Sequence, residues 1–172
     1  MKTIILLLLM LLPTMAMNRA FTKITKIEAI NLSVEERIVK VLRDSGYSRQ
    51  MQRIILAQAK NESACFKSLL SVRHNNIFGM MHPGRKTLTF SLGGHGYAEG
   101  RYGYAVYSSI DSAVADYIQY RKRMSIPSSD DPTTYILALK KKGYFTSDVK
   151  EYIRNVRFWM RRDTSVHNFS SN

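Results

Sequence analysis

The chain has 172 residues, which is enough for one ordinary domain and too few for two independent cores of common size. Hydrophobic residues make up 45% of the chain and charged residues 23%, so the composition excludes a disordered protein and predicts a globular one. The formal net charge of +13 favours an anionic partner, and a single cysteine excludes an intramolecular disulfide.

The N-terminal segment has the organisation of an export signal. Lys2 supplies a positive charge, an apolar run follows over residues 4–12, and a small-residue sequence ends at Ala16. A membrane anchor is the alternative, but this run falls well short of the roughly 20 apolar residues that a spanning helix needs. We therefore predict a signal peptide over residues 1–16, with Ala20 as a second candidate cleavage point.

Two helices are predicted after the leader. A capping-box spacing begins at Ser33, and apolar residues then recur at helical intervals as far as Gly46. The second helix begins after Ser48 and carries an apolar stripe towards Glu62. A carboxyl group is therefore expected at the end of a buried helix face.

The middle of the chain changes character over residues 82–104, where glycines alternate with β-prone residues and predict a small irregular hairpin. Helical periodicity resumes after Ser109. A further helix is predicted from the Asp131 cap to a stop at Gly143, and a last one starts near Thr146 or Ser147.

These elements predict one mainly α domain over residues 33–162, of α+β type, followed by a flexible tail over residues 163–172. The lone cysteine, Cys65, has no basic neighbour in sequence and is expected to pack as a small buried side chain. Histidines are scattered without the spacing of a zinc site, so neither a metal nor a cofactor is predicted.

Glu62 is a candidate general acid. Cleavage of a glycosidic bond needs a carboxylic acid that stays protonated near neutral pH, and burial among apolar groups favours that protonated form. Apolar residues precede Glu62 on its predicted helix, and Cys65, Phe66 and Leu69 follow it. Spacing alone leaves open the alternative of an ordinary surface glutamate.

Four motifs occur in an order that resembles a known family. The segment 57–63 reads A-Q-A-K-N-E-S, segment 75–79 reads N-N-I-F-G, segment 104–107 reads Y-A-V-Y, and segment 143–146 reads G-Y-F-T. The set is similar to the glucosaminidase-domain family of bacterial autolysins, glycoside hydrolase family 73. The resemblance runs from about Val34 to Val156.

The resemblance implies a lysozyme-like helical domain with a small β-hairpin lobe flanking the cleft. Its implied activity is that of an endo-β-N-acetylglucosaminidase on peptidoglycan glycan strands, with Glu62 as general acid. The residues implied in substrate binding are Asn75, Asn76, Phe78, Gly79 and Tyr104. From the residues alone, the two asparagines could simply form a turn and Phe78 could simply pack in the core.

The same resemblance implies two further catalytic residues. Glu99 is the one acid in the lobe where the family places a second carboxylate, and a surface role remains open for it. Tyr144 matches the first tyrosine of the family's G-Y-A-T-D-P-x-Y segment. Phe145 replaces its alanine and Tyr152 is two positions later than its last tyrosine, so this match is incomplete.

Three other functions remain as alternatives: a lytic transglycosylase, a non-catalytic glycan-binding protein on the same fold, and a nucleic-acid-binding protein suggested by charge alone. The predicted export disfavours nucleic acid. We expect a monomer in the periplasm or the extracellular cell envelope, with no stable membrane anchor once the leader is removed.

Overall fold

The computed structural model describes residues 32–81 and 103–162, which belong almost entirely to the second of two compact units, Met1–Ser33 and Val34–Asn172. This described part is mainly helical. Its helices are α2 (Val34–Asp44), α3 (Arg49–Glu62), α4 (Leu69–His74), α6 (Ile110–Arg123), α7 (Pro132–Lys141) and α8 (Val149–Arg162).

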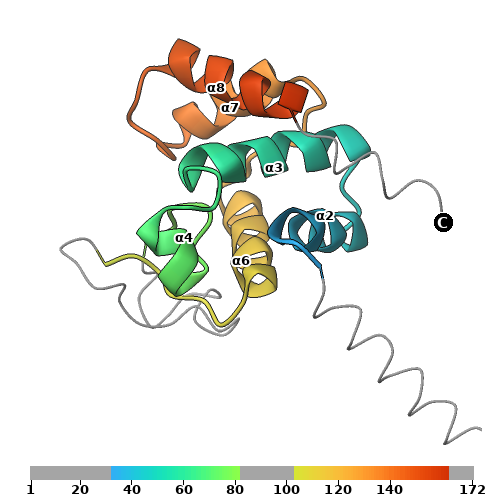
Figure 1. Ribbon diagram of the computed structural model, residues 1–172. Helices are drawn as coiled ribbons and strands as arrows, with labels where there is room; N and C mark the ends of the chain where they lie inside the picture. The colour runs from blue at the N-terminus through green and yellow to red at the C-terminus, as the bar shows by residue number, and fades with distance from the viewer. Residues whose placement is uncertain (1–31, 82–102, 163–172) are drawn as a thin grey trace, which may run out of the picture. The chain divides into compact units, whose positions relative to one another are not determined.

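Helix α3 is the centre of the unit, because it packs against α8 on one side and α2 on the other (Figure 1). Helix α2 also packs on α6, and α7 packs on α8. All six residues from Ile54 to Ala59 of α3 are fully buried, so this helix is covered around its circumference. Glu62, its last residue, is therefore carried by the most deeply buried helix of the fold.

Glycine ends two of the helices, as the sequence predicts. Gly46 after α2 has φ +80° and Gly143 after α7 has φ +72°, a backbone region that other residues rarely adopt. In both places the following tyrosine N–H returns to a carbonyl of the last turn, from Tyr47 to Leu42 and from Tyr144 to Leu139, each at 3.1 Å. The two turns thereby fix where Tyr47 and Tyr144 lie.

The segment after α3 differs from a simple loop. Ala64, Cys65 and Phe66 all have positive φ, between 50° and 64°, and form a left-handed turn. Ser63 supports the turn by donating to the Ala59 carbonyl at 2.6 Å and accepting from the Phe66 N–H at 2.8 Å. Cys65, expected to be buried, is partly exposed in this turn.

The structure differs from the sequence-based prediction at the start of the last helix and in one short additional helix. The last helix begins at Val149 rather than at Thr146 or Ser147, because the Asp148 carboxylate caps it by accepting from the Glu151 N–H at 2.9 Å. The sequence did not predict α4, whose six residues are too few for a clear period.

The hairpin lobe predicted over residues 82–104 lies, except for residues 103 and 104, outside the described residues. Where the described chain meets that segment, Met81 and Tyr104 form an antiparallel bridge. None of the described helices is both long and apolar enough to cross a bilayer.

Candidate active site

Glu62 brings a carboxyl group to the surface of the core. It is only partly buried, and it occupies the last position of α3, one helical turn beyond Gln58. The hydroxyl of Tyr152, from α8, donates a hydrogen bond to Glu62 Oε1. The packing of α8 on α3 thus joins two residues that are far apart in sequence.

The surroundings of Glu62 change its acidity. Burial raises the pKa of Glu62 above its ordinary value, and the hydrogen bond from Tyr152 lowers that pKa by a smaller amount. The first effect favours the protonated carboxylic acid, whereas the second stabilises the carboxylate left after proton donation. A carboxyl group with both influences is suited to general-acid chemistry.

The other oxygen of Glu62 lies beside Gly79. A side chain built at position 79 would begin 3.8 Å from Glu62 Oε2, and the φ of Gly79 is +62°. Both observations indicate that position 79 suits glycine: the backbone conformation disfavours other residues, and a longer side chain would cover the carboxyl group. Glycine here leaves the approach to Oε2 clear of a side chain.

The asparagines before Gly79 shape the loop that carries it. Asn76 is 1% exposed, and its amide nitrogen donates to the carbonyls of Met80 and Ala105, both at 2.9 Å. Its amide oxygen accepts from the Met80 N–H at 2.9 Å. Asn75 donates to the Tyr107 carbonyl at 2.9 Å. Both asparagine amides therefore bond backbone groups and fix the path of residues 76–80.

Phe78 anchors the same loop in the core. Its ring is 1% exposed and stacks on Tyr117 of α6 with centroids 4.1 Å apart. Its carbonyl accepts a hydrogen bond of 2.7 Å from the Tyr144 hydroxyl. Tyr144 therefore holds the backbone next to Gly79, and burial raises the pKa of its hydroxyl well above the ordinary value. This phenol stays protonated at neutral pH.

Two departures from the family pattern, Phe145 and Tyr152, contact each other. Their rings stack with centroids 3.9 Å apart and planes 10° from parallel. The loop that follows Phe145 is held by Lys140, whose ammonium group donates to the carbonyls of Thr146 and Ser147, both at 2.8 Å. The ring of Phe145 thus packs against the tyrosine that bonds Glu62.

Of the two remaining predicted site residues, one borders the loop of residues 76–80 and one lies outside the described residues. Tyr104 is partly exposed and forms the bridge to Met81. Glu99 lies outside the described residues. Within residues 32–81 and 103–162, no group of His, Cys, Asp or Glu side chains is arranged to hold a metal ion.

The sequence of this chain matches a known protein family. Residues 37–164 match the family described as Glucosaminidase, mannosyl-glycoprotein endo-beta-N-acetylglucosaminidase. The chain belongs to the glucosaminidase family. No curated protein matches the chain.

A solved structure shows the same fold as the glucosaminidase domain. It is a chain from a type VI secretion system effector-immunity complex of Pseudomonas protegens, with a TM-score of 0.54 and 19% sequence identity. The similarity covers 76% of this chain and 96% of the other. At that identity it establishes the architecture alone.

Tyr152 is the residue of this glucosaminidase domain that sequence reasoning did not include in the site. In the sequence it stands two positions later than the last tyrosine of the family segment. The pattern of α8 contained a usable signal, because Tyr152, Val156 and Met160 recur at four-residue intervals and form its buried face. A polar hydroxyl on such a face requires a hydrogen-bond partner, and Glu62 supplies the acceptor.

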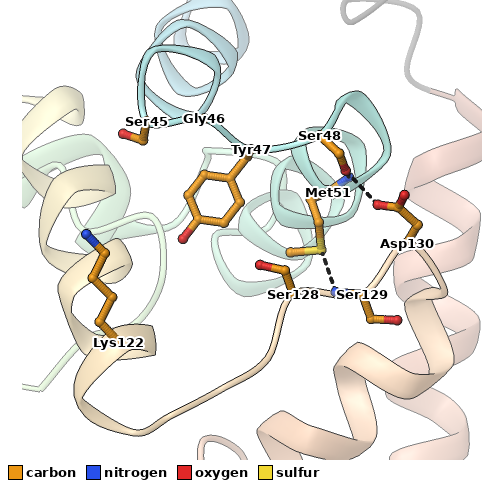
Figure 2. A pocket seen from close by; sticks show the side chains of 9 residues that line it. All are labelled: Ser45, Gly46, Tyr47, Ser48, Met51, Lys122, Ser128, Ser129 and Asp130. Atoms are coloured by element: carbon orange, nitrogen blue, oxygen red, sulfur yellow. Dashed lines mark hydrogen bonds between the residues drawn. The ribbon is translucent and has the colours of Figure 1, made fainter.

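A separate hollow of about 520 Å³ lies at the other end of α3 (Figure 2). Residues of the α2–α3 turn, the end of α6 and the connection before α7 line it. Ser48 donates to Asp130 across it at 2.6 Å, and the Ser129 N–H points to the Met51 sulfur at 3.3 Å. Because α3 is 14 residues long, roughly 20 Å separates this hollow from Glu62.

Proposed function

We propose that the chain is a peptidoglycan hydrolase, an endo-β-N-acetylglucosaminidase, with Glu62 as the general acid. The observation that carries the proposal is the environment of Glu62: a carboxyl group whose pKa is raised by burial, hydrogen-bonded on one oxygen and unobstructed by a side chain at position 79 on the other. Membership of the glucosaminidase family supplies the class of bond.

In this proposal the proton is delivered from Oε2. Tyr152 occupies Oε1, so the protonated Oε2 faces Gly79 and donates to the glycosidic oxygen as its bond to C1 breaks. Positive charge develops at C1, and the hydrogen bond from Tyr152 stabilises the new carboxylate. Water finally adds its hydroxide to C1, and its proton restores the acid.

Two routes are proposed for the attack on C1. Glu99 activates water directly in an inverting route, which requires carboxylates roughly 6.5–9.5 Å apart. Alternatively, the acetamido group of N-acetylglucosamine attacks first and water opens the resulting ring, which retains the configuration. NMR of the newly formed end distinguishes them, since α product indicates inversion and β product indicates retention.

The substrate in this proposal is the glycan strand of peptidoglycan, bound along the loop of Asn75, Asn76, Phe78 and Gly79 with Tyr104 as a sugar-stacking residue. The asparagines contribute through the backbone that they fix. Tyr144 is proposed to act at the same place by holding the Phe78 carbonyl next to Gly79. Such a substrate requires export to the cell envelope, as the predicted leader provides.

Digestion of purified peptidoglycan tests the activity. The mature protein and Glu62→Gln are incubated with sacculi, and the soluble products are reduced with borohydride and analysed by mass spectrometry. Reduced N-acetylglucosamine ends from the wild type, absent with Glu62→Gln, are the expected result.

Each alternative function gives a different product pattern in this assay. Anhydro-muramic ends would identify a lytic transglycosylase, which also works with one glutamate. Binding to sacculi of several chemotypes without any release would identify a non-catalytic glycan-binding protein. Reduced N-acetylglucosamine ends released equally by Glu62→Gln would remove Glu62 from the mechanism.

A further inference from the structure

A groove of about 470 Å³ runs along α8 beside the start of α7. Four of the residues that line it are basic, and they follow one another at intervals of three or four residues along α8: Lys150, Arg154, Arg157 and Arg161. Ile153 and Thr133 complete the lining. Residues spaced in this way share one face of a helix, so the cations form a single stripe.

The stripe is only partly neutralised. Glu151 bonds Arg154 at 3.3 Å, and Arg157 donates to the Thr133 hydroxyl at 2.8 Å. Within the described part of the chain, no ion pair involves Lys150 or Arg161. An anion entering the groove would therefore meet two cations with no acidic partner of their own.

The charge of α8 is less balanced than that of α2. Helix α8 has five basic side chains and one acidic side chain, whereas α2 has three of each. The α2 charges pair within the fold, as in Arg37 with Asp111 at 3.0 Å and Lys40 with Asp44. A balanced helix needs no external partner, but the imbalance on α8 favours a polyanion.

The groove is also separate from the site at Glu62. Tyr152, which bonds Glu62, belongs to the buried face of α8, and Lys150, Arg154 and Arg161 are about half a helical turn around from it. A ligand in the groove would therefore touch the side of α8 that faces away from Glu62. Its effect would be retention on the polymer rather than participation in bond cleavage.

We propose that this groove binds the carboxylate-bearing stem peptides of peptidoglycan and holds the enzyme on the sacculus. The proposal rests on the proposed function, which makes peptidoglycan the substrate. Arginine has a planar fork of donors that matches a carboxylate, and cations about one helical turn apart suit a chain carrying repeated carboxylates. Ile153 offers an apolar contact for alanine methyl groups between them.

The test measures binding to sacculi in a Glu62→Gln background, so its result does not depend on hydrolysis. The groove variant combines Lys150→Gln, Arg154→Gln and Arg161→Gln. A matched control removes the same charge from exposed lysines outside the groove, by Lys122→Gln, Lys141→Gln and Lys142→Gln. Circular dichroism and thermal melting confirm that both variants fold.

At about 50 mM salt we expect the groove variant to bind sacculi at least about tenfold more weakly than the control, with a smaller loss of binding on adding salt. Converting the sacculus carboxylates to amides with a carbodiimide and ammonium should abolish that difference. Equal binding by the two variants would overturn the proposal.

A parallel experiment with phosphatidylglycerol vesicles tests whether the groove instead binds phosphate groups. A difference between the variants on vesicles, without one on sacculi, would assign the groove to anionic lipid and overturn the proposal. If the proposed function is wrong, the wild type releases no soluble products from sacculi, whatever the binding result. That outcome is therefore distinguishable from failure of the groove proposal.

Discussion

Two polar clusters lie one helical turn apart on α3, and both consist of a side-chain oxygen that accepts from tyrosine hydroxyls. At Gln58, which is fully buried, the amide oxygen accepts from Tyr117 at 2.7 Å and from Tyr135 at 3.1 Å. At Glu62, which is partly exposed, the carboxyl oxygen accepts from Tyr152. The partners are the same in kind, but their surroundings differ.

The difference separates a structural cluster from a chemical one. The Gln58 amide does not ionise, and the hydroxyls of Tyr117 and Tyr135, 2.6 Å apart, are sealed in the core. Burial raises the pKa of Tyr135 to about 12, so this phenol stays neutral. Glu62 can lose its proton, and its second oxygen faces Gly79. Similar hydrogen bonds therefore stabilise the core at Gln58 and, in the proposed mechanism, stabilise the ionised acid at Glu62.

The largest expected effect is that of Glu62→Gln on the rate. General acids contribute roughly 10²–10⁴-fold to catalysis, so kcat on peptidoglycan should fall by about that factor. The glutamine can still accept from Tyr152, so the unfolding free energy at pH 7 should not decrease. Release of soluble fragments and urea denaturation measure the two quantities. A variant that keeps full activity, or one that unfolds, would contradict the assignment.

Gln58→Leu should have the opposite pattern. Leucine removes the shared acceptor and leaves one of two buried hydroxyls without an acceptor, which destabilises the fold by about 1–3 kcal/mol. Urea denaturation measures the loss. The specific activity of the folded variant should stay near that of the wild type. A large loss of activity with unchanged stability would remove the distinction between the clusters.

Tyr152→Phe should alter the pH dependence of the rate. Without the hydrogen bond to the carboxylate, the pKa of Glu62 rises further, so the alkaline limb of the pH–rate profile moves to higher pH. The rate below that limb should fall by roughly 10- to 150-fold, because hydrogen bonds to charged groups contribute about 1.5–3 kcal/mol.

Tyr144→Phe is the matched control for Tyr152→Phe. It removes a hydroxyl that bonds the Phe78 carbonyl, so it should leave the position of the alkaline limb unchanged. A shift of the limb in Tyr144→Phe alone would transfer the role at Glu62 from Tyr152 to Tyr144.

The smallest expected effect is on stability as a function of pH. Because the pKa of Glu62 is higher in the folded than in the unfolded chain, its stabilisation is present at low pH and is lost as pH rises through the folded pKa. Glu62→Gln does not titrate there. Its unfolding free energy relative to wild type should therefore increase over that window and then level off, as urea denaturation across a pH series would show. A pH-independent difference would contradict the raised pKa.

Local sequence features predicted most of the helices, because caps, stops and apolar periods act within a few residues. Asp131 caps α7 through the Thr134 N–H at 2.8 Å, and Ser48 caps α3 through the Met51 N–H at 3.1 Å. The short α4 and the left-handed turn of residues 64–66 were missed. Their geometry follows from the packing around Ser63, which is fully buried, rather than from a repeating pattern.

For the site, the sequence by itself determined the family and placed Glu62 at the end of a buried helix, since both depend on short motifs read along the chain. Only the tertiary structure decided which groups meet there. The contact of Tyr152 with Glu62 spans 90 residues, and that of Tyr144 with Phe78 spans 66. Such contacts depend on how α8 packs against α3 and how Tyr144 packs against the tyrosines of α6, which no local pattern encodes. The packing of α8 brings Tyr152 to Glu62 and so helps to set its acidity.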